Sequence, residues 1–238
     1  MKYMGSKNRI AKHILPIMLA ERKPEQWWVE PFVGGANMID KVGGKRVGAD
    51  INPHLIDALI AIRDCVSDLP KNNKEFTEAD YKELRKSNNY KYKGYAGFAL
   101  SYSGKWLGGW CRDGKGQRDY VREAYRNAIN QSPKLQGVRF VESSYQDLEI
   151  KPNSIIYCDP PYEGTTKYKD DFNHAEFWQW CRDKVKEGHT VFVSEYNAPD
   201  DFECIWQKEI VSSLTKDTGS KKGIEKLFRL PGGRVLYI

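Results

Sequence analysis

A carboxylate followed by two prolines and a tyrosine is the feature of the sequence with the clearest chemical meaning. Asp159, Pro160, Pro161 and Tyr162 directly follow the apolar run 154–158, which indicates a buried strand. The prolines fix the backbone and provide no N–H donor, so the loop offers a carboxylate and carbonyl oxygens as acceptors. Such a loop suits an exocyclic amine, because hydrogen bonds from the amine would favour a geometry in which its lone pair can attack.

The same four residues could have a purely structural role. In that interpretation the prolines only end the strand, and Asp159 caps the next turn. The position favours a functional role, because ligands of open α/β sheets bind at the carboxyl ends of the strands. Tyr162 would then stack on a nucleic-acid base, which has to be extracted from the duplex at a cost of roughly a few kcal/mol.

A glycine-containing turn forms a second candidate site. Gly34 and Gly35 follow a predicted strand at 26–30. Asp50 ends the next predicted strand, 45–50. Glycines let the backbone approach a nucleoside-like ligand, and an acid about 20 residues further on can bind ribose hydroxyls. A complete G-x-G-x-x-G is absent here, which argues against a nicotinamide dinucleotide, and the alternative is a plain strand-to-helix turn.

The basic charge of the chain is concentrated in one segment. Residues 71–139 contain 15 Lys and Arg against 7 Asp and Glu, whereas the remaining residues contain 23 against 25. The same segment interleaves aromatic residues with the basic ones. Together these side chains supply the phosphate neutralisation and base stacking that nucleic-acid binding requires. The alternative is a solvated, lysine-rich helical insertion with aromatic side chains in its core.

Glycines flank aromatic and basic residues between positions 104 and 118, a pattern typical of a hairpin or finger. An arginine bound bidentately to guanine would give roughly 1–3 kcal/mol of discrimination, and an aromatic wedge could fill the gap left by an extracted base. For each aromatic side chain, packing in a small core is an equally strong alternative. The candidates for DNA contact are Tyr102, Lys105, Trp106, Trp110, Arg112, Lys115 and Arg118.

Several other classes are disfavoured. The cysteines form no C-x-x-C pair and the histidines no zinc-enzyme spacing, so we expect no metal site. The phosphate-loop-like run 109–115 is followed by Gly116 instead of Ser or Thr, which argues against an ATPase. No Pro-Cys pair exists, which disfavours cytosine-C5 transfer. Without a signal peptide or a membrane-length apolar run, we expect a cytoplasmic protein.

The order of the predicted elements indicates an α/β protein. The first strand leads through the glycine turn into a helix, and the second leads into an apolar helix at 55–62. The alternation resumes after residue 137 and ends in antiparallel strands, which predicts a Rossmann-like sheet. The later predicted elements are strands 138–141, 154–158 and 189–194, a helix at 175–185, antiparallel strands from Phe202 onward, and a turn at 231–234 before a last strand at 235–238.

An insertion of roughly 80 residues interrupts the sheet, which is far too long for an ordinary loop. We therefore expect a discontinuous sheet domain, residues 1–57 and 138–238, and a separate, mainly helical domain, residues 58–137, that carries the finger. Within the insertion, a polar helix is predicted at 78–86 and an amphipathic helix at 120–129.

Five motifs in one order resemble those of the Dam-type (D12 class) family of N6-adenine-specific DNA methyltransferases. Ala36 departs from the pattern, because it stands where the family often has a third glycine. The insertion resembles the family only loosely, which leaves the recognition sequence open. The motifs lie at 2–7, 29–37, 48–53, 142–145 and 157–162.

The resemblance implies an enzyme that transfers the methyl group of S-adenosylmethionine directly to N6 of a flipped adenine, with S-adenosylhomocysteine as product and no metal. It implies that Asp159, Pro160 and Tyr162 are catalytic and that the insertion is the target-recognition domain. The implied setting is a bacterium or a bacteriophage-infected cell. The partner would be double-stranded DNA, with no membrane involved, and a monomer is compatible with the sequence. The implied cofactor-binding residues are Tyr3, Lys7, Glu30, Phe32, Gly34, Asp50, Ser144, Tyr145 and Asp159.

Three other functions are compatible with the residues. A cytosine-N4 DNA methyltransferase and an RNA adenine methyltransferase use the same amine chemistry, and a catalytically silent DNA-binding module could keep the fold. By family resemblance, Asp at position 159, rather than Ser or Asn, favours adenine. The basic and aromatic insertion favours DNA.

Overall fold

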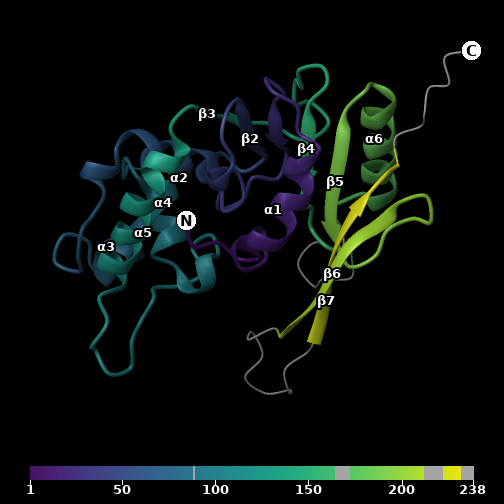
Figure 1. Cartoon of the computed structure of the whole chain (residues 1–238). Coiled ribbons are helices and arrows are strands. Elements are labelled where there is room, and N and C mark those ends of the chain that lie inside the picture. The colour runs from purple at the N-terminus through teal and green to yellow at the C-terminus, as the bar shows by residue number, and fades with distance from the viewer. Residues whose placement is uncertain (88, 164–171, 212–221, 232–238) are drawn as a thin grey trace, which may run out of the picture.

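The computed structural model describes residues 1–87, 89–163, 172–211 and 222–231. The centre of this part of the chain is a seven-stranded sheet with the strand order β3-β2-β1-β4-β5-β7-β6 (Figure 1). The strands are β1 (Trp28–Glu30), β2 (Arg46–Asp50), β3 (Val138–Glu142), β4 (Ile155–Cys158), β5 (Thr190–Glu195), β6 (Glu203–Val211) and β7 (Lys222–Arg229).

The strand order places a candidate ligand site at the ends of β1 and β4. Strands β3, β2, β1, β4 and β5 pair in parallel, and β7 inserts antiparallel between β5 and β6. The order reverses between the neighbouring strands β1 and β4, and ligands of such sheets bind at the carboxyl ends beside that switch point. Glu30 ends β1 and Asp159 directly follows β4. The predicted α/β, Rossmann-like sheet is therefore confirmed.

Both faces of the sheet are covered. Alternate residues of a strand face opposite sides, and Trp28 and Val29 accordingly belong to two different buried clusters. Figure 1 shows α1 and α6 on opposite sides of the sheet. Burial on both faces explains why the central strand β4 and most of β5 are apolar. The helices are α1 (Ala11–Ala20), α2 (Pro53–Asp64), α3 (Glu78–Leu84), α4 (Lys93–Ala99), α5 (Tyr120–Leu135) and α6 (His174–Lys186).

The helices begin where the sequence supplies caps. The Asn52 side chain accepts the backbone N–H of His54 at 3.1 Å at the start of α2, and Pro53 occupies the first turn. The Asp119 side chain accepts the N–H of Arg122 at 2.8 Å at the start of α5. The amphipathic helix predicted at 120–129 is confirmed, and α5 continues for six further residues.

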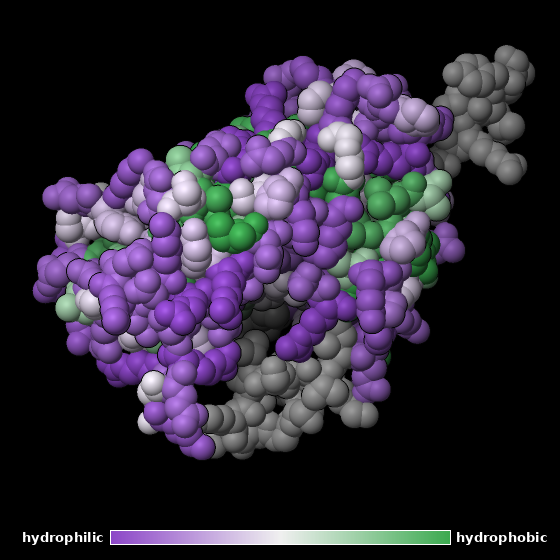
Figure 2. All heavy atoms as spheres, turned by 60° about the vertical axis from the view of Figure 1, so that its left-hand side comes forward, coloured by the Kyte–Doolittle hydropathy of each residue, from purple (hydrophilic) through white to green (hydrophobic). Residues whose placement is uncertain are grey.

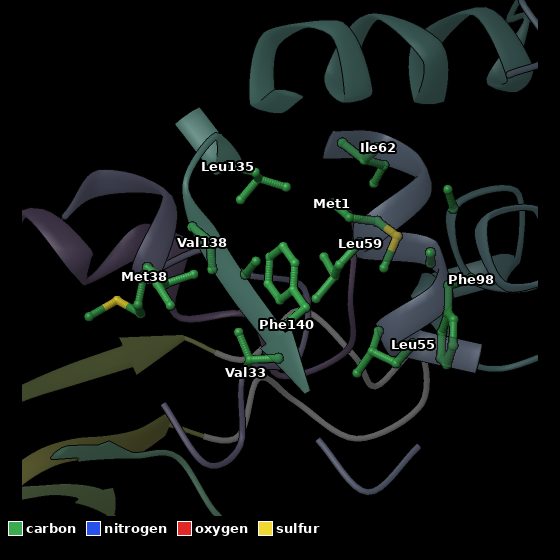
Figure 3. Close-up of a cluster of buried hydrophobic side chains, with 14 of the residues drawn as sticks. Met1, Val33, Met38, Leu55, Leu59, Ile62, Phe98, Leu135, Val138 and Phe140 are labelled. Atoms are coloured by element: carbon green, nitrogen blue, oxygen red, sulfur yellow. The ribbon is translucent and has the colours of Figure 1, made fainter. Parts of the chain in front are cut away.

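The larger core joins the sheet to the inserted helices. Figure 3 shows Val138 and Phe140 of β3 against Leu55 and Leu59 of α2, with Leu135 of α5 beside them. Helix α2 runs unbroken past residue 57, so a division at that point would lie inside this helix. The division into two domains stays a prediction. The shared core means that the helices on either side of the finger are anchored on the sheet.

Two local expectations differ from the structure. The glycine turn leads only into the short 3-10 helix Ile39–Lys41, because few residues separate the turn from β2. The chain has left the helical conformation by Gly44, which has a φ of 75°. The finger starts with an isolated bridge between Ser101 and Trp110 and continues as an irregular loop to residue 118, instead of forming a ladder of paired strands. Most of the predicted turn at 231–234 and the last predicted strand lie outside the described residues. No helix in the described ranges has the length and apolar character to cross a membrane.

Candidate active site at the sheet switch point

A buried ion pair lies at the centre of the site. Lys7 begins the 3-10 helix Lys7–Arg9, and its Nζ lies 2.8 Å from Oδ1 of Asp159. Only 8% of the Lys7 side chain and 22% of the Asp159 side chain are exposed. Burial raises the pKa of Asp159, and the Lys7 ammonium opposes that rise. Burial works to lower the pKa of Lys7, but the carboxylates of Asp159 and Glu225 outweigh it, so the pKa of Lys7 is raised and the ammonium stays charged.

The loop after β4 holds Tyr162 against three other side chains. The Tyr162 hydroxyl donates to Oε2 of Glu225 at 2.7 Å. The Lys7 ammonium lies 4.5 Å from the centre of the Tyr162 ring, and the Tyr196 ring meets it edge-on at 4.6 Å. Pro160 is buried in the same loop. The ring predicted to stack on a base is thus fixed beside Asp159.

Glu195 ties the end of this loop to β5. Its side chain is buried and accepts the backbone N–H groups of Tyr196 at 2.6 Å and of Glu163 at 3.2 Å. Burial raises the pKa of Glu195 to about 7, and these two hydrogen bonds oppose the rise. Glu195 therefore links the carboxyl ends of β4 and β5 through backbone contacts.

Glu30 adds a further buried carboxyl group at the end of β1. It is 2% exposed, and the Trp28 indole N–H donates to its Oε1 at 2.8 Å. Burial raises the pKa of Glu30 to about 8. Asp159, Glu195 and Glu225 thus lie near the ammonium of Lys7, and Glu30 lies close enough to Asp159 for the two carboxyl groups to repel each other. Such a site favours a positively charged ligand. Within the described ranges, no group of His, Cys, Asp or Glu side chains could hold a metal ion.

Gly34 and Asp50 form a second part of the site at the ends of β1 and β2. The Gly34 N–H donates to Oδ2 of Asp50 at 3.3 Å, and the Asn52 N–H donates to Oδ1 at 3.1 Å. Gly34 has a φ of 49°, and a Cβ there would lie 3.0 Å from the ring of Tyr3, so glycine allows this close approach. Burial raises the pKa of Asp50. Beside it the apolar side chain of Ile51 is 73% exposed, which leaves a surface for a flat, apolar group.

An aromatic wall lies on the other side of the sheet edge. The rings of Phe32 and Tyr145 lie 5.4 Å apart, and both contact Phe177 of α6. The Ser144 hydroxyl donates to Asp147 at 2.6 Å and so fixes the turn after β3. All the residues predicted to bind the cofactor therefore lie at or near the carboxyl ends of the parallel strands.

The aromatic residues of the finger divide into packed and exposed ones. Trp106 stacks on His54 of α2 with ring centres 4.3 Å apart, and Trp110 packs 5.5 Å from Tyr81. Tyr102 is 64% exposed. The two tryptophans are therefore packed against other side chains, which is the alternative considered for each aromatic residue of this segment. Tyr102 is the aromatic side chain of the predicted set that remains accessible to a partner.

The arginines of the finger have acidic partners. Arg112 pairs with Glu78 of α3, and its Nε lies 3.0 Å from Oε2 of that residue. Arg118 pairs with Glu123 at 2.5 Å. DNA would have to compete with these carboxylates. The lysines of the predicted set are Lys115, which is exposed, and Lys105, which is half-buried. Figure 2 shows that the face formed by the inserted helices is largely hydrophilic.

Sequence reasoning missed Glu195, Tyr196 and Glu225. The rule that identified Asp159 could have found the first two, because the predicted strand 189–194 ends directly before them. No local pattern marks Glu225, which reaches the site only because β7 inserts beside β5.

Comparison with known proteins gives a family match for part of the chain. Residues 3–103 match the family model described as D12 class N6 adenine-specific DNA methyltransferase. The type II methyltransferase M.FokI of Planomicrobium okeanokoites is 23% identical over 208 residues, which cover 76% of this chain and 31% of that protein. This chain thus spans less than a third of the length of that relative.

Two RNA methyltransferases are among the solved structures that match the chain. The rRNA methyltransferase AviRa of Streptomyces viridochromogenes has a TM-score of 0.44 at 10% identity, covering 96% of this chain and 86% of that one. The tRNA methyltransferase TrmI of Aquifex aeolicus has a TM-score of 0.42 at 8% identity, covering 95% and 69%.

The family match agrees with the motifs predicted at 2–7, 29–37 and 48–53, whereas the motifs at 142–145 and 157–162 lie beyond the matched residues. Over residues 3–103, the chain therefore has the sequence pattern of the D12 class N6 adenine-specific DNA methyltransferases.

Proposed function

We propose that this chain is an S-adenosylmethionine-dependent DNA methyltransferase that modifies N6 of adenine. The observation that supports this best is the position of Asp159, which lies at the carboxyl end of β4 beside the switch point, with Pro160 and Tyr162 in the same loop. The family match over residues 3–103 supports the same chemistry.

The charge and shape of the site fit this cofactor. When bound, S-adenosylmethionine would supply an electrophilic methyl group on a sulfonium cation and leave as S-adenosylhomocysteine. The excess of carboxyl groups around Lys7 suits a cation, and Glu30 would hold an ammonium group. Asp50 would bind ribose hydroxyls, and the exposed side chain of Ile51 would cover a base. The further residues proposed for the pocket are Tyr3, Phe32, Gly34, Ser144 and Tyr145.

The residues of the loop would act on the target amine. The Asp159 carboxylate and the Pro160 carbonyl would accept its hydrogen bonds and so favour a geometry in which the nitrogen lone pair is available. Tyr162 would stack on the adenine, which must leave the duplex to reach this edge of the sheet. No covalent intermediate with the protein is expected.

DNA would be recognised by the inserted residues 58–137. The finger presents Tyr102 and Lys115 to solvent, and Arg112 and Arg118 would exchange their carboxylate partners for phosphates or guanine. The proposed contact region also includes Lys105, Trp106 and Trp110. The two tryptophans pack against other aromatic side chains and would support the region from inside.

The test is single-molecule sequencing of plasmid DNA from a methylation-deficient bacterial host that expresses the chain. N6-methyladenine in one short motif is expected, and it should be absent from a matched strain that expresses Asp159→Ala. Unmodified DNA despite a folded, cofactor-binding protein would overturn the proposal and make RNA the next substrate to test. N4-methylcytosine would overturn the choice of base.

A further inference from the structure

Glu225 is a carboxylate from a distant strand that touches the loop proposed to be catalytic. It lies on β7, 63 residues from Tyr162 along the chain, yet its Oε2 accepts the Tyr162 hydroxyl at 2.7 Å. Only 15% of its side chain is exposed. Glu225 thus joins β7, the antiparallel neighbour of β5, to the loop that follows β4.

The Glu225 carboxylate is itself held in place. The same Oε2 lies 4.0 Å from Nζ of Lys7, and that ammonium also contacts Asp159 at 2.8 Å. Lys7 is buried, so the ion pair is poorly screened by solvent. Lys7 therefore fixes Glu225 and Asp159 relative to each other.

The Tyr162 ring is consequently held at two points. Its hydroxyl is held by Glu225, and the edge-on Tyr196 ring and the Lys7 ammonium hold the ring itself. A tyrosine ring with a held hydroxyl loses little further conformational freedom when a base stacks on it. A weakly held ring would have to be ordered at the same moment as the base.

We propose that Glu225 is a positioning residue that holds the ring of Tyr162 beside Asp159 for the flipped base. The proposal rests on the methyl-transfer function proposed above. It assigns to β7 a part in the reaction, in addition to its role in the sheet. Glu225 acts through Tyr162, so its effect depends on the tyrosine hydroxyl.

A double-mutant cycle tests that dependence. Glu225→Ala should lower kcat about tenfold in the wild-type background, which corresponds to the loss of one charge-assisted hydrogen bond. In the Tyr162→Phe background, which keeps the ring and lacks the hydroxyl, the same change should have less than about a twofold effect. The Kd for S-adenosylmethionine should stay within about twofold in all four proteins. Equal losses in both backgrounds, or no loss in either, would overturn the proposal.

Two further variants guard the result. Glu225→Gln keeps the size of the side chain and a weaker acceptor, so it should fall between wild type and Glu225→Ala, and it replaces the alanine variant if that one does not fold. Ile224→Thr is the matched control, because this neighbouring side chain on β7 is 48% exposed, and its kcat should be unchanged.

An activity-free measurement separates the two proposals. In protein labelled with 13C at the hydroxyl-bearing carbon of tyrosine, Tyr162→Phe identifies the Tyr162 resonance, and Glu225→Ala should shift it. An unmoved resonance would overturn the contact, whatever the enzyme does. A wild-type protein that methylates no DNA but shows the shift would overturn the proposed function, and with it the role of Glu225 in that reaction.

Discussion

At the scale of single residues, the site combines several carboxyl groups whose pKa values are raised by burial. Burial raises the pKa of Glu30 to about 8 and that of Glu195 to about 7, and it also raises the pKa of Asp159. A folded protein stabilises such groups in their protonated form, and a cationic ligand would favour their ionisation. Binding of the proposed cationic cofactor should therefore release protons from these groups.

The pKa of Glu30 predicts how stability depends on pH. Between its ordinary pKa of 4.5 and about 8, the folded chain holds a proton that the unfolded chain has released, so Glu30 lowers stability as pH rises through this window. Glu30→Gln cannot ionise. From pH 5 to pH 8 the variant should therefore gain stability relative to wild type, by at most about 4 kcal/mol.

Urea unfolding of the cofactor-free proteins at several pH values measures this gain. Glu149→Gln serves as the control, because Lys151 lowers the pKa of this exposed group and its titration falls outside the window. The prediction would be contradicted if the free energy of unfolding changed with pH in the same way for wild type and Glu30→Gln.

Substitution of Asp159 should separate chemistry from DNA binding. Asp159→Ala removes the proposed acceptor for the target amine and should abolish turnover, while the affinity for DNA stays largely intact because the proposed DNA contacts lie in the insertion. Steady-state methyl transfer and fluorescence anisotropy with labelled DNA measure the two effects. Retained turnover would refute the role of Asp159, and Asp159→Asn tests the charge with little change in shape.

At the scale of elements, the contact between α2 and α4 anchors the insertion. Gly94 of α4 lies so close to α2 that an added Cβ would be 2.2 Å from the His54 carbonyl oxygen and 3.0 Å from the Ala58 nitrogen. A backbone cannot yield as the end of a flexible side chain can. The two helices must therefore separate if Gly94 acquires a side chain.

Gly94→Ala should accordingly lower the free energy of unfolding by about 1–3 kcal/mol. Gly114→Ala in the finger is the matched control, since a Cβ there has no neighbour within 4 Å, and its effect should stay within about 0.5 kcal/mol. Denaturant unfolding compares the two alanine variants. Equal stabilities would show that α4 is not held tightly against α2.

At the scale of the whole molecule, charge is distributed unevenly between two regions. The sheet edge gathers carboxyl groups around Lys7, whereas residues 71–139 contain the surplus of basic residues. Opposite fields of this kind would hold a cationic cofactor at one place and a polyanion at the other. Arg112 and Arg118 each pair with a glutamate, which reduces the positive potential of the basic region. A phosphate that replaced these glutamates would restore the pairing with an anion of the DNA.

The finger should therefore contribute to the salt dependence of DNA binding. Lys115→Ala should weaken binding about equally for all sequences and reduce the slope of log K against log salt by about 0.9, the value for one phosphate contact. Lys186→Ala on α6 is the control, because this exposed lysine lies outside the basic segment. Titrations between low and physiological salt give both slopes. An unchanged slope for Lys115→Ala would place the DNA elsewhere.

The sequence by itself determined the features that depend on local patterns. Buried parallel strands require apolar runs, so 154–158 and 138–141 indicated β4 and β3. The apolar spacing of α2 and α5 indicated these helices, and the strand end before Asp159 indicated the edge at which the candidate site lies. The helix expected after Gly35 was wrong, because the space available before β2 is a tertiary constraint.

Only the tertiary structure decided which distant side chains meet at that edge. Glu225 joins Tyr162 because β7 inserts antiparallel between β5 and β6, and Trp106 packs on His54 because α2 lies beneath the base of the finger. These contacts join residues far apart in the sequence, and such pairings leave no periodic pattern along the chain. The core that couples the inserted helices to the sheet was hidden for the same reason, since each element shows only its own apolar face.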